Sequence, residues 1–380
     1  MCRLYFAICA LFLLVLARAE GGEFRGAWVA SVHNLDWPSS PGLPAATQKA
    51  QLRAILDRAA ELKLNAILLQ VRPASDALYS SKEEPWSQFL SGKQGGAPGY
   101  DPLEFAIKEA HARGIELHAW INPFRAATNA KTHLEASHVA RQHPEWVRRF
   151  GTQLWIDPGE PAAREYVLRV ITDIVRRYDI DGLHIDDYFY PYPVKGASFP
   201  DDSTWGRYGL TSGLNRGDWR RENINDFVRS MYRSVKTTKP SVRVGISPFG
   251  IWRPGVPPTT EAQLDAYGQL FADSRKWLAE GWCDYLAPQL YWGIQPAKQS
   301  FPVLLSWWRA QSRGKPVWPG IATDRIGAIR SAQEIIDQIA LTRKGTTSPG
   351  HIHWSVKSLM QNRGGIAERL RAGPYAEAPE

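Results

Sequence analysis

Residues 163–188 have the sequence AREYVLRVITDIVRRYDIDGLHIDDY, in which a helical pattern leads directly into a strand pattern. In the first part, apolar side chains recur at the spacing of one helix face, at Tyr166, Val167, Val170, Ile171 and Ile174. From residue 182 the period becomes two, because His184 and Asp186 alternate with Leu183 and Ile185. A helix followed by a short apolar strand is the repeating unit of α/β folds.

The same unit recurs along the whole chain of 380 residues. Apolar runs typical of strands lie at 25–32, 66–71, 116–122, 182–188, 243–249, 285–291, 316–322 and 351–356. Segments with helical spacing lie between them, at 48–63, 102–113, 163–178, 219–237, 261–280, 302–313, 331–344 and 363–371. This alternation predicts an α/β fold, a single (β/α)8 TIM barrel. A doubly wound open sheet is the alternative, but no GxGxxG or GxxxxGK[ST] sequence opens a helix.

Three connections of this barrel are long: 72–100 after strand 2, 123–160 after strand 3 and 189–218 after strand 4. Loops of this length in a compact domain are usually functional, and in a TIM barrel they surround the active site. The chain also contains 16 Trp, and exposed Trp and Tyr rings are common stacking surfaces for sugars. The loops therefore predict a groove for an extended ligand.

The two ends of the chain differ from its centre. Residues 1–19, MCRLYFAICALFLLVLARA, combine an early Arg, an apolar run and an A-x-A site, which is typical of a secretory signal peptide. We therefore expect a signal peptide at 1–19, a barrel at 20–371 and a frayed C-terminal tail at 372–380. We also expect a periplasmic or cell-envelope location, without a membrane span once the leader is removed.

Composition narrows the classes of function. Three Cys cannot build a disulfide scaffold, and no His/Cys cluster has zinc spacing, so we predict no metal and no cofactor. The net charge of +8 suits an anionic cell-wall polymer, and we expect no nucleic-acid partner.

The candidate catalytic residues lie at the end of strand 4. Since Leu183 and Ile185 suit the helix side of the strand, His184 and Asp186 are expected to point into the barrel. Catalytic residues of TIM barrels occupy the C-terminal ends of strands, which makes Asp186 the leading candidate. Asp187 follows it at the start of the loop.

Other strand ends supply further polar and aromatic side chains. The candidate substrate-binding residues are Arg72, Trp120, Asn122, Arg125, Asp157, His184, Tyr188, Gln289, Tyr291 and Trp292. We expect stacking surfaces at Trp86, Trp120, Trp155, Trp252 and Trp292. Arg72 has a second interpretation, an ion pair with a structural acid, and Asp157 has one as a loop anchor.

Inward carboxylates beside amide, guanidinium and indole groups fit glycoside hydrolysis, which needs a proton donor and a second carboxylate as nucleophile or base. Strand 5 ends in Ser247-Pro248-Phe249-Gly250 and supplies no acid. The donor is therefore Asp187, Asp76, Asp157, Asp324 or a loop residue such as Glu84. A serine hydrolase is disfavoured because no GxSxG occurs.

Seven stretches of the chain resemble the glycosyl-hydrolase-like 10 family of bacterial cell-envelope proteins. They are FRGAWVASVHNLDWPS (24–39), LNAILLQVRPASDALYSS (64–81), GIELHAWINPFRA (114–126), LWIDPGEPAAREYV (154–167), DIDGLHIDDYFYPYP (179–193), VRVGISPFGIWR (242–253) and DYLAPQLYW (284–292). The resemblance implies a (β/α)8 glycosidase that acts on N-acetylhexosamine glycans, one characterised kind of which cuts peptide-free peptidoglycan strands. The strand-4 motif also resembles that of the alpha-amylase clan, whose nucleophile matches Asp186, although the clan's strand-5 glutamate is missing here.

The sequence thus predicts a secreted peptidoglycan glycosidase with Asp186, Asp187 and Asp76 as catalytic candidates. A non-catalytic glycan-binding barrel is the alternative, which the missing strand-5 acid favours. A starch-type amylase is a third and weaker hypothesis.

Overall fold

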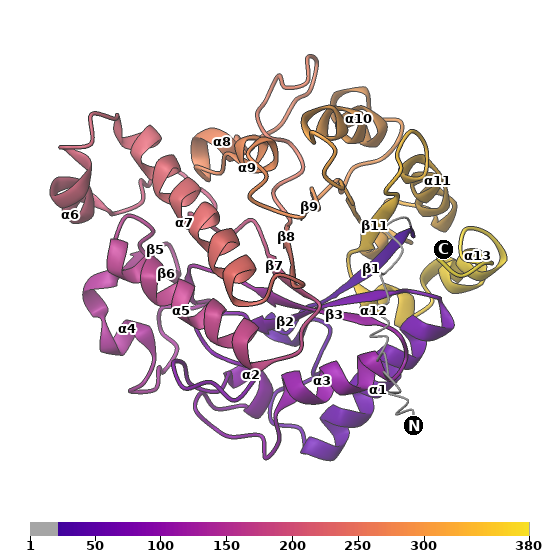
Figure 1. The fold of residues 1–380 in the computed structure, drawn as a ribbon, viewed down its shortest axis with the longest axis horizontal. Helices are drawn as coiled ribbons and strands as arrows, with labels where there is room; N and C mark the ends of the chain where they lie inside the picture. Colours follow the sequence, from indigo (N-terminus) through magenta and orange to yellow (C-terminus); the bar gives the residue numbers. More distant parts are fainter. Residues whose placement is uncertain (1–21, 380) are drawn as a thin grey trace, which may run out of the picture.

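The computed structural model describes residues 22–379, so the signal peptide expected at 1–19 lies outside the described residues. Eight parallel strands form one curled sheet in the order β10-β11-β1-β2-β3-β7-β8-β9. Figure 1 shows these strands at the centre of the molecule with the helices arranged around them. Their bounds are β1 Phe24–Val29, β2 Ala66–Arg72, β3 Glu116–Ile121, β7 Gly182–Ile185, β8 Arg243–Ile246, β9 Tyr285–Leu286, β10 Gly320–Ile321 and β11 Gly350–His353.

The two edges of this sheet meet and close it. Parallel bridges join Leu286 to Val317 and Gln289 to Gly320, between β9 and the start of β10. The Leu286 amide donates to the Pro316 carbonyl at 3.0 Å, and the Trp318 amide donates to the Leu286 carbonyl at 2.9 Å. Closure leaves no exposed edge, and the eight-strand α/β barrel expected from the sequence is confirmed.

The outer helices match the predicted helical segments with one exception. They are α1 Ala45–Glu61, α3 Pro102–His111, α5 Pro161–Arg177, α7 Arg216–Thr238, α10 Phe301–Gln311, α11 Ala332–Thr342 and α13 Ile366–Ala372. A further short helix, α12 Val356–Met360, lies outside the predicted helical segments. The helix expected at 261–280 is wrong, because two short helices replace it, α8 Ala266–Gln269 and α9 Ser274–Ala279. Phe271 adopts a φ of 54° between them, and Asp273 caps α9 by accepting from the Lys276 amide. Across the described residues, no helix is long and apolar enough to cross a membrane.

The segments that follow β2, β3 and β7 carry small elements of their own. A three-stranded antiparallel sheet in the order β4-β6-β5 follows β3, with bounds β4 Arg125–Ala127, β5 Val147–Phe150 and β6 Gln153–Ile156. Short helices complete these segments, at α2 Gln88–Ser91, α4 Val139–Gln142 and α6 Asp202–Thr204.

The barrel packs two separate apolar layers. Leu183 and Ile185 of β7 belong to the large cluster between strands and helices, as their alternation predicted. The barrel interior holds a second cluster that is rich in aromatic rings, including Trp28, Trp120 and Tyr285. These rings fill the interior, so the space available to a ligand lies above them at the C-terminal ends of the strands.

The segment after α13, expected as a frayed tail, is instead anchored to the barrel. The Tyr375 side chain is fully buried, and its hydroxyl contacts Nε2 of His351 and lies 2.8 Å from Nε2 of His353. The Arg25 guanidinium lies over the Tyr375 ring at 4.7 Å and donates to the Glu377 carbonyl at 2.8 Å. The segment is therefore not frayed, because the Tyr375 ring packs against barrel residues that are distant in the sequence.

Replacing Tyr375 with Ala is expected to lower the free energy of unfolding by about 3–5 kcal/mol, because a fully buried ring is lost. Tyr375→Phe keeps the ring and loses only the hydroxyl contacts, so about 1 kcal/mol is expected. Urea denaturation of both variants measures the difference. Equal stability of Tyr375→Ala and the wild type would show that the segment contributes nothing to the fold.

Candidate active site

A cavity of about 230 Å³ opens at the C-terminal ends of the barrel strands. Its walls come from β1, β3 and the segments that follow β7, β8, β9, β10 and β11. The lining residues are Trp28, Trp120, Asp186, Asp187, Tyr188, Tyr192, Ser247, Gln289, Tyr291, Asp324, Arg325 and Trp354. Three carboxyl groups and six aromatic rings therefore surround one space.

Asp186 points inward, as the alternation of β7 predicted, and is held by N–H donors. Its Oδ2 accepts from Trp120 Nε1 at 3.0 Å and from Asn122 Nδ2 at 3.3 Å. Its Oδ1 accepts from the Tyr188 amide at 3.3 Å. Burial and, to a smaller extent, the Asp187 charge raise the pKa of Asp186 to about 7, although the Arg125 charge opposes the shift. This carboxyl can therefore change protonation state near neutral pH.

Asp187 lies in the same cavity and has different partners. The Tyr192 hydroxyl donates to its Oδ2. Burial raises the pKa of Asp187, while hydrogen bonds from Tyr192 and Gln289 lower it. Burial is the largest of these effects, so the pKa of Asp187 lies above that of a free carboxyl group.

Asp324 reaches the cavity from the opposite side of the barrel, after β10. Its backbone amide donates to the Trp354 carbonyl at 2.8 Å, which fixes the turn that carries it. Within residues 22–379 its Oδ1 is buried without a hydrogen-bond partner, while the side chain as a whole is 32% exposed. Burial raises the pKa of Asp324, and the charges of Arg325, Arg363 and Arg330 oppose this shift. A partly exposed carboxyl group on the cavity wall can contact a ligand.

A polar chain supports the cavity floor from below. Trp28 Nε1 lies 3.2 Å from His184 Nε2, and His184 Nδ1 lies 3.0 Å from the Tyr285 hydroxyl. An indole N–H can only donate, so Nε2 of His184 is the acceptor and Nδ1 carries the proton. Tyr285 then donates to His118 Nδ1 at 2.9 Å. His184 thus points into the barrel but lies under the cavity and does not line it.

Several predicted ligand-binding residues take structural positions instead. Arg72 and Glu84 form an ion pair at 2.6 Å in which both side chains are fully buried, so neither reaches the cavity. Asp76 is also fully buried, outside the cavity lining; burial raises its pKa to about 7, and Ser87 and Gln94 oppose the shift. Trp155 is buried and donates to the Phe189 carbonyl at 2.8 Å, so its ring is not a stacking surface.

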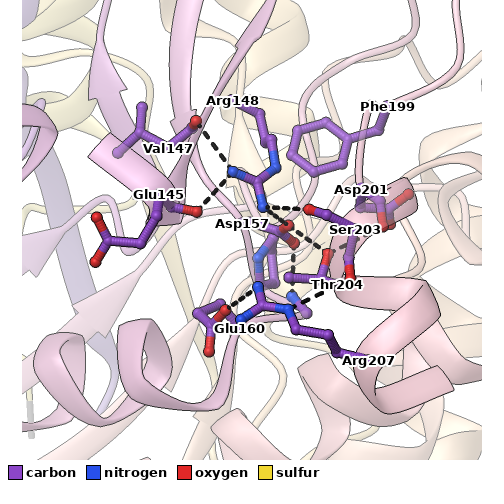
Figure 2. Close-up of polar contacts among 12 residues, drawn as sticks. Glu145, Val147, Arg148, Asp157, Glu160, Phe199, Asp201, Ser203, Thr204 and Arg207 are labelled. Atoms are coloured by element: carbon purple, nitrogen blue, oxygen red, sulfur yellow. Dashed lines mark hydrogen bonds and ion pairs between the residues drawn. The ribbon is translucent and has the colours of Figure 1, made fainter. Parts of the chain in front are cut away.

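Asp157 belongs to a polar cluster between the β4-β6-β5 sheet and α6. Its Oδ2 accepts from Thr204 Oγ1 at 2.6 Å and lies 3.2 Å from Arg148 Nη2. Its Oδ1 accepts from the Gly159 amide at 2.9 Å. Figure 2 shows these contacts beside a second pair, Arg207 with Glu160. Asp157 is therefore the loop anchor that its second interpretation proposed, and it lies outside the cavity lining.

The remaining substrate-binding candidates lie in or beside the cavity, whereas the predicted stacking surfaces Trp86 and Trp252 line none of the three cavities described. Trp120, Tyr188, Gln289 and Tyr291 line it, whereas Trp292 lines an adjoining cavity of about 550 Å³. Asn122 and Arg125 lie behind its wall, Asn122 donating to Asp186, and the Arg125 guanidinium stacks 4.1 Å from the centre of the Tyr188 ring.

Sequence reasoning missed part of the lining. Trp28, Tyr192, Ser247, Arg325 and Trp354 line the cavity but were not predicted individually as site residues. Trp28 alternates with the apolar residues of β1 and could have been placed inward by the argument used for Asp186. Among residues 22–379, no group of three or more His, Cys, Asp or Glu is arranged to hold a metal ion.

Comparisons with known proteins agree with this geometry. Residues 23–336 match the family described as Glycosyl hydrolase-like 10. The chain is 41% identical over 368 residues to "Glycosyl hydrolase YngK" of Bacillus subtilis, which covers 93% of this chain and 72% of that protein. It is 36% identical over 306 residues to "Glycosyl hydrolase DigH" of Escherichia coli K12, a match that covers 75% of this chain and 69% of that protein.

The fold is also similar to solved structures at low sequence identity. The catalytic domain of beta-amylase from Paenibacillus polymyxa matches with a TM-score of 0.59 and 12% identity. The match covers 93% of this chain and 98% of that one. At this identity the similarity concerns the fold alone.

Asp186→Asn is expected to stabilise the protein at about pH 8 more than at about pH 5. Because the folded-state pKa of Asp186 is raised to about 7, its contribution to stability is lost as pH rises from the unfolded value of 3.8 through 7. At pH values above 7, removing the charge should therefore increase the free energy of unfolding by a few kcal/mol. Urea denaturation at both pH values measures it, with the exposed Asp179→Asn as control. An equal effect of Asp186→Asn at both pH values would contradict the raised pKa.

Proposed function

The chain belongs to the glycosyl hydrolase-like 10 family, and from this premise we propose that it cleaves the glycan strands of peptidoglycan after their stem peptides have been removed. The observation that carries the proposal is the set of three carboxyl groups around one aromatic cavity at the C-terminal end of the barrel. Glycoside hydrolysis needs two carboxyl groups on either side of the scissile bond. The sequence resemblance supports the N-acetylhexosamine substrate, and the leader-like residues 1–19 support a periplasmic or cell-envelope location.

Asp186 acts at the anomeric carbon in this proposal. Two side-chain N–H groups, from Trp120 and Asn122, hold one of its oxygens, and the other oxygen, Oδ1, accepts only from the Tyr188 amide among the described residues. A carboxylate fixed in this way stabilises the positive charge of an oxocarbenium-like transition state, as nucleophile or as ion.

Asp324 is the proton donor that the structure supports best. It faces the cavity from β10, whereas Asp186 and Asp187 come from β7, and three steps around the barrel separate those strands. Burial raises its pKa, which favours the protonated form that a general acid needs. Asp187 is less suited because Tyr192 already donates to its carboxylate. Asp324 would give its proton to the glycosidic oxygen, and water would complete the cleavage at the anomeric carbon.

The space around the carboxyl groups supports a polymeric substrate. The central cavity shares Tyr188 and Tyr192 with a cavity of about 250 Å³ on one side. It shares Tyr291 and Arg325 with the cavity of about 550 Å³ on the other. Three adjoining spaces lined by aromatic rings suit several sugars in a row.

Peptide-free peptidoglycan strands are expected to release soluble fragments with the wild-type protein, detected by mass spectrometry. Asp186→Asn is expected to lower kcat at least about a thousandfold, roughly 4 kcal/mol in activation free energy. Strands that still carry stem peptides serve as the comparison substrate. Sedimentation with the polymer without any soluble product, unchanged by Asp186→Asn, would instead favour a non-catalytic glycan-binding barrel.

Asp324→Asn is expected to lower kcat on glycan strands by about 10²–10⁴ but to leave cleavage of an aryl glycoside with a good leaving group nearly intact. Such a leaving group needs no proton, so only a general acid shows this difference. Asp187→Asn and Asp76→Asn are the matched comparisons. If Asp187→Asn instead loses activity on glycan strands but not on the aryl glycoside, and Asp324→Asn stays fully active on strands, the proton donor is Asp187.

A further inference from the structure

The cavity of about 550 Å³ beside the carboxyl groups contains two arginines, Arg325 and Arg330. Both come from the segment between β10 and α11. The cavity joins the central one at Tyr291 and Arg325, so a ligand in it lies next to Asp324. Neither the family match nor the proposed chemistry assigns a role to this pair.

Arg330 is a buried cation whose hydrogen-bonding capacity is only partly used. Its side chain is 7% exposed, yet within the described part of the chain its buried Nε has no hydrogen-bond partner. Nη2 donates to the Tyr291 carbonyl at 2.8 Å, and Nη1 lies 3.6 Å from Glu334 Oε1. Because the side chain is buried, the guanidinium charge has lost hydration, which lowers the pKa of Arg330. A bound anion would restore that stabilisation.

The carboxylate already present in this cavity is occupied by other groups. Glu334 Oε1 accepts from the Ile294 amide at 2.8 Å and from Gln338 Nε2 at 3.2 Å. Arg325 is more open, with a side chain that is 56% exposed and a single contact to Asp324 at 3.7 Å. The cavity therefore presents one open and one buried guanidinium to a ligand.

We propose that Arg325 and Arg330 form an anion subsite that binds the free lactyl carboxylate of an N-acetylmuramic acid residue beside the scissile bond. This inference rests on the proposed function. Guanidinium groups match a carboxylate with paired N–H donors. In a peptide-free strand this carboxylate is ionised, whereas a stem peptide converts it to a neutral and bulky amide. The subsite would thus select strands whose peptides have been removed.

The test compares two substrates that differ only in this group: peptide-free strands with the carboxylate intact, and the same strands with the carboxyl reduced to an alcohol. The wild-type protein is expected to prefer the intact strands at least about tenfold in kcat/KM. In Arg325→Ala this preference should fall to nearly one. The preference is the readout because any effect of the substitution on Asp324 lowers both rates equally.

Arg53→Ala is the matched control, since Arg53 is 51% exposed and forms one ion pair, with Glu109, on the outer helix α1. Arg53→Ala should keep the full preference for intact strands. Arg330→Gln should lose this preference, and an unfolding midpoint at the same urea concentration as the wild type shows that the variant is folded. Equal cleavage of both substrates by the wild type, or an unchanged preference in Arg325→Ala, would overturn the subsite. If neither substrate is cleaved, the proposed function fails, and co-sedimentation of the two polymers with each variant still tests the subsite.

Discussion

The buried ion pair between Arg72 and Glu84 is the constraint on which the site depends. Arg72 Nη1 donates to the Asn122 and Pro123 carbonyls at 2.6 and 3.1 Å, so the end of β2 holds the turn after β3. That turn presents Asn122 to Asp186 and carries Arg125 behind Tyr188. Two charges without solvent are tolerable only while each is paired, and losing one partner typically costs about 3–5 kcal/mol. The geometry around Asp186 is therefore tied to a contact that no ligand touches.

The interior below the cavity shows how the strands make room for polar aromatic groups. A Cβ at Gly245 would lie 1.9 Å from Cζ of Tyr285, and one at Gly182 would lie 2.4 Å from Nδ1 of His118. Glycine at these two positions lets Tyr285 sit between His184 and His118 and satisfy both rings. The relay in turn fixes Trp28, which forms part of the cavity wall. Small residues on two strands thus determine where an aromatic ring on a third can lie.

The barrel and the direction of Asp186 were predictable because both follow from local periodicity. The roles of Arg72, Asp76 and Asp157 were not, since a polar residue at a strand end looks the same whether it faces a ligand or a buried partner. Arg72 finds Glu84 through loop packing, and Asp157 finds Thr204 across an insertion whose small sheet had no clear strand pattern. The broken helix at 261–280 and the anchored Tyr375 are likewise set by capping and distant contacts. Local pattern determines the elements, whereas tertiary contacts decide which polar groups remain free.

Barrel strand 5, which is β8, supplies no acid, and the contacts after this strand explain why the proposed mechanism takes its proton donor from another strand. β8 ends at Ile246, and the next residue, Ser247, lines the cavity. Gln289 Nε2 donates to the Ser247 carbonyl at 3.0 Å. Past that point Gly250 packs so closely that a Cβ would lie 2.2 Å from the Gln289 carbonyl oxygen. A carboxylic side chain at Gly250 would therefore collide with the Gln289 backbone, so this position cannot supply the acid. The proposed acid instead follows β10, two strands further around the closed barrel, where Asp324 lines the cavity. In the proposed mechanism the two acids therefore come from β7 and β10, three steps apart around the barrel, and β8 contributes none.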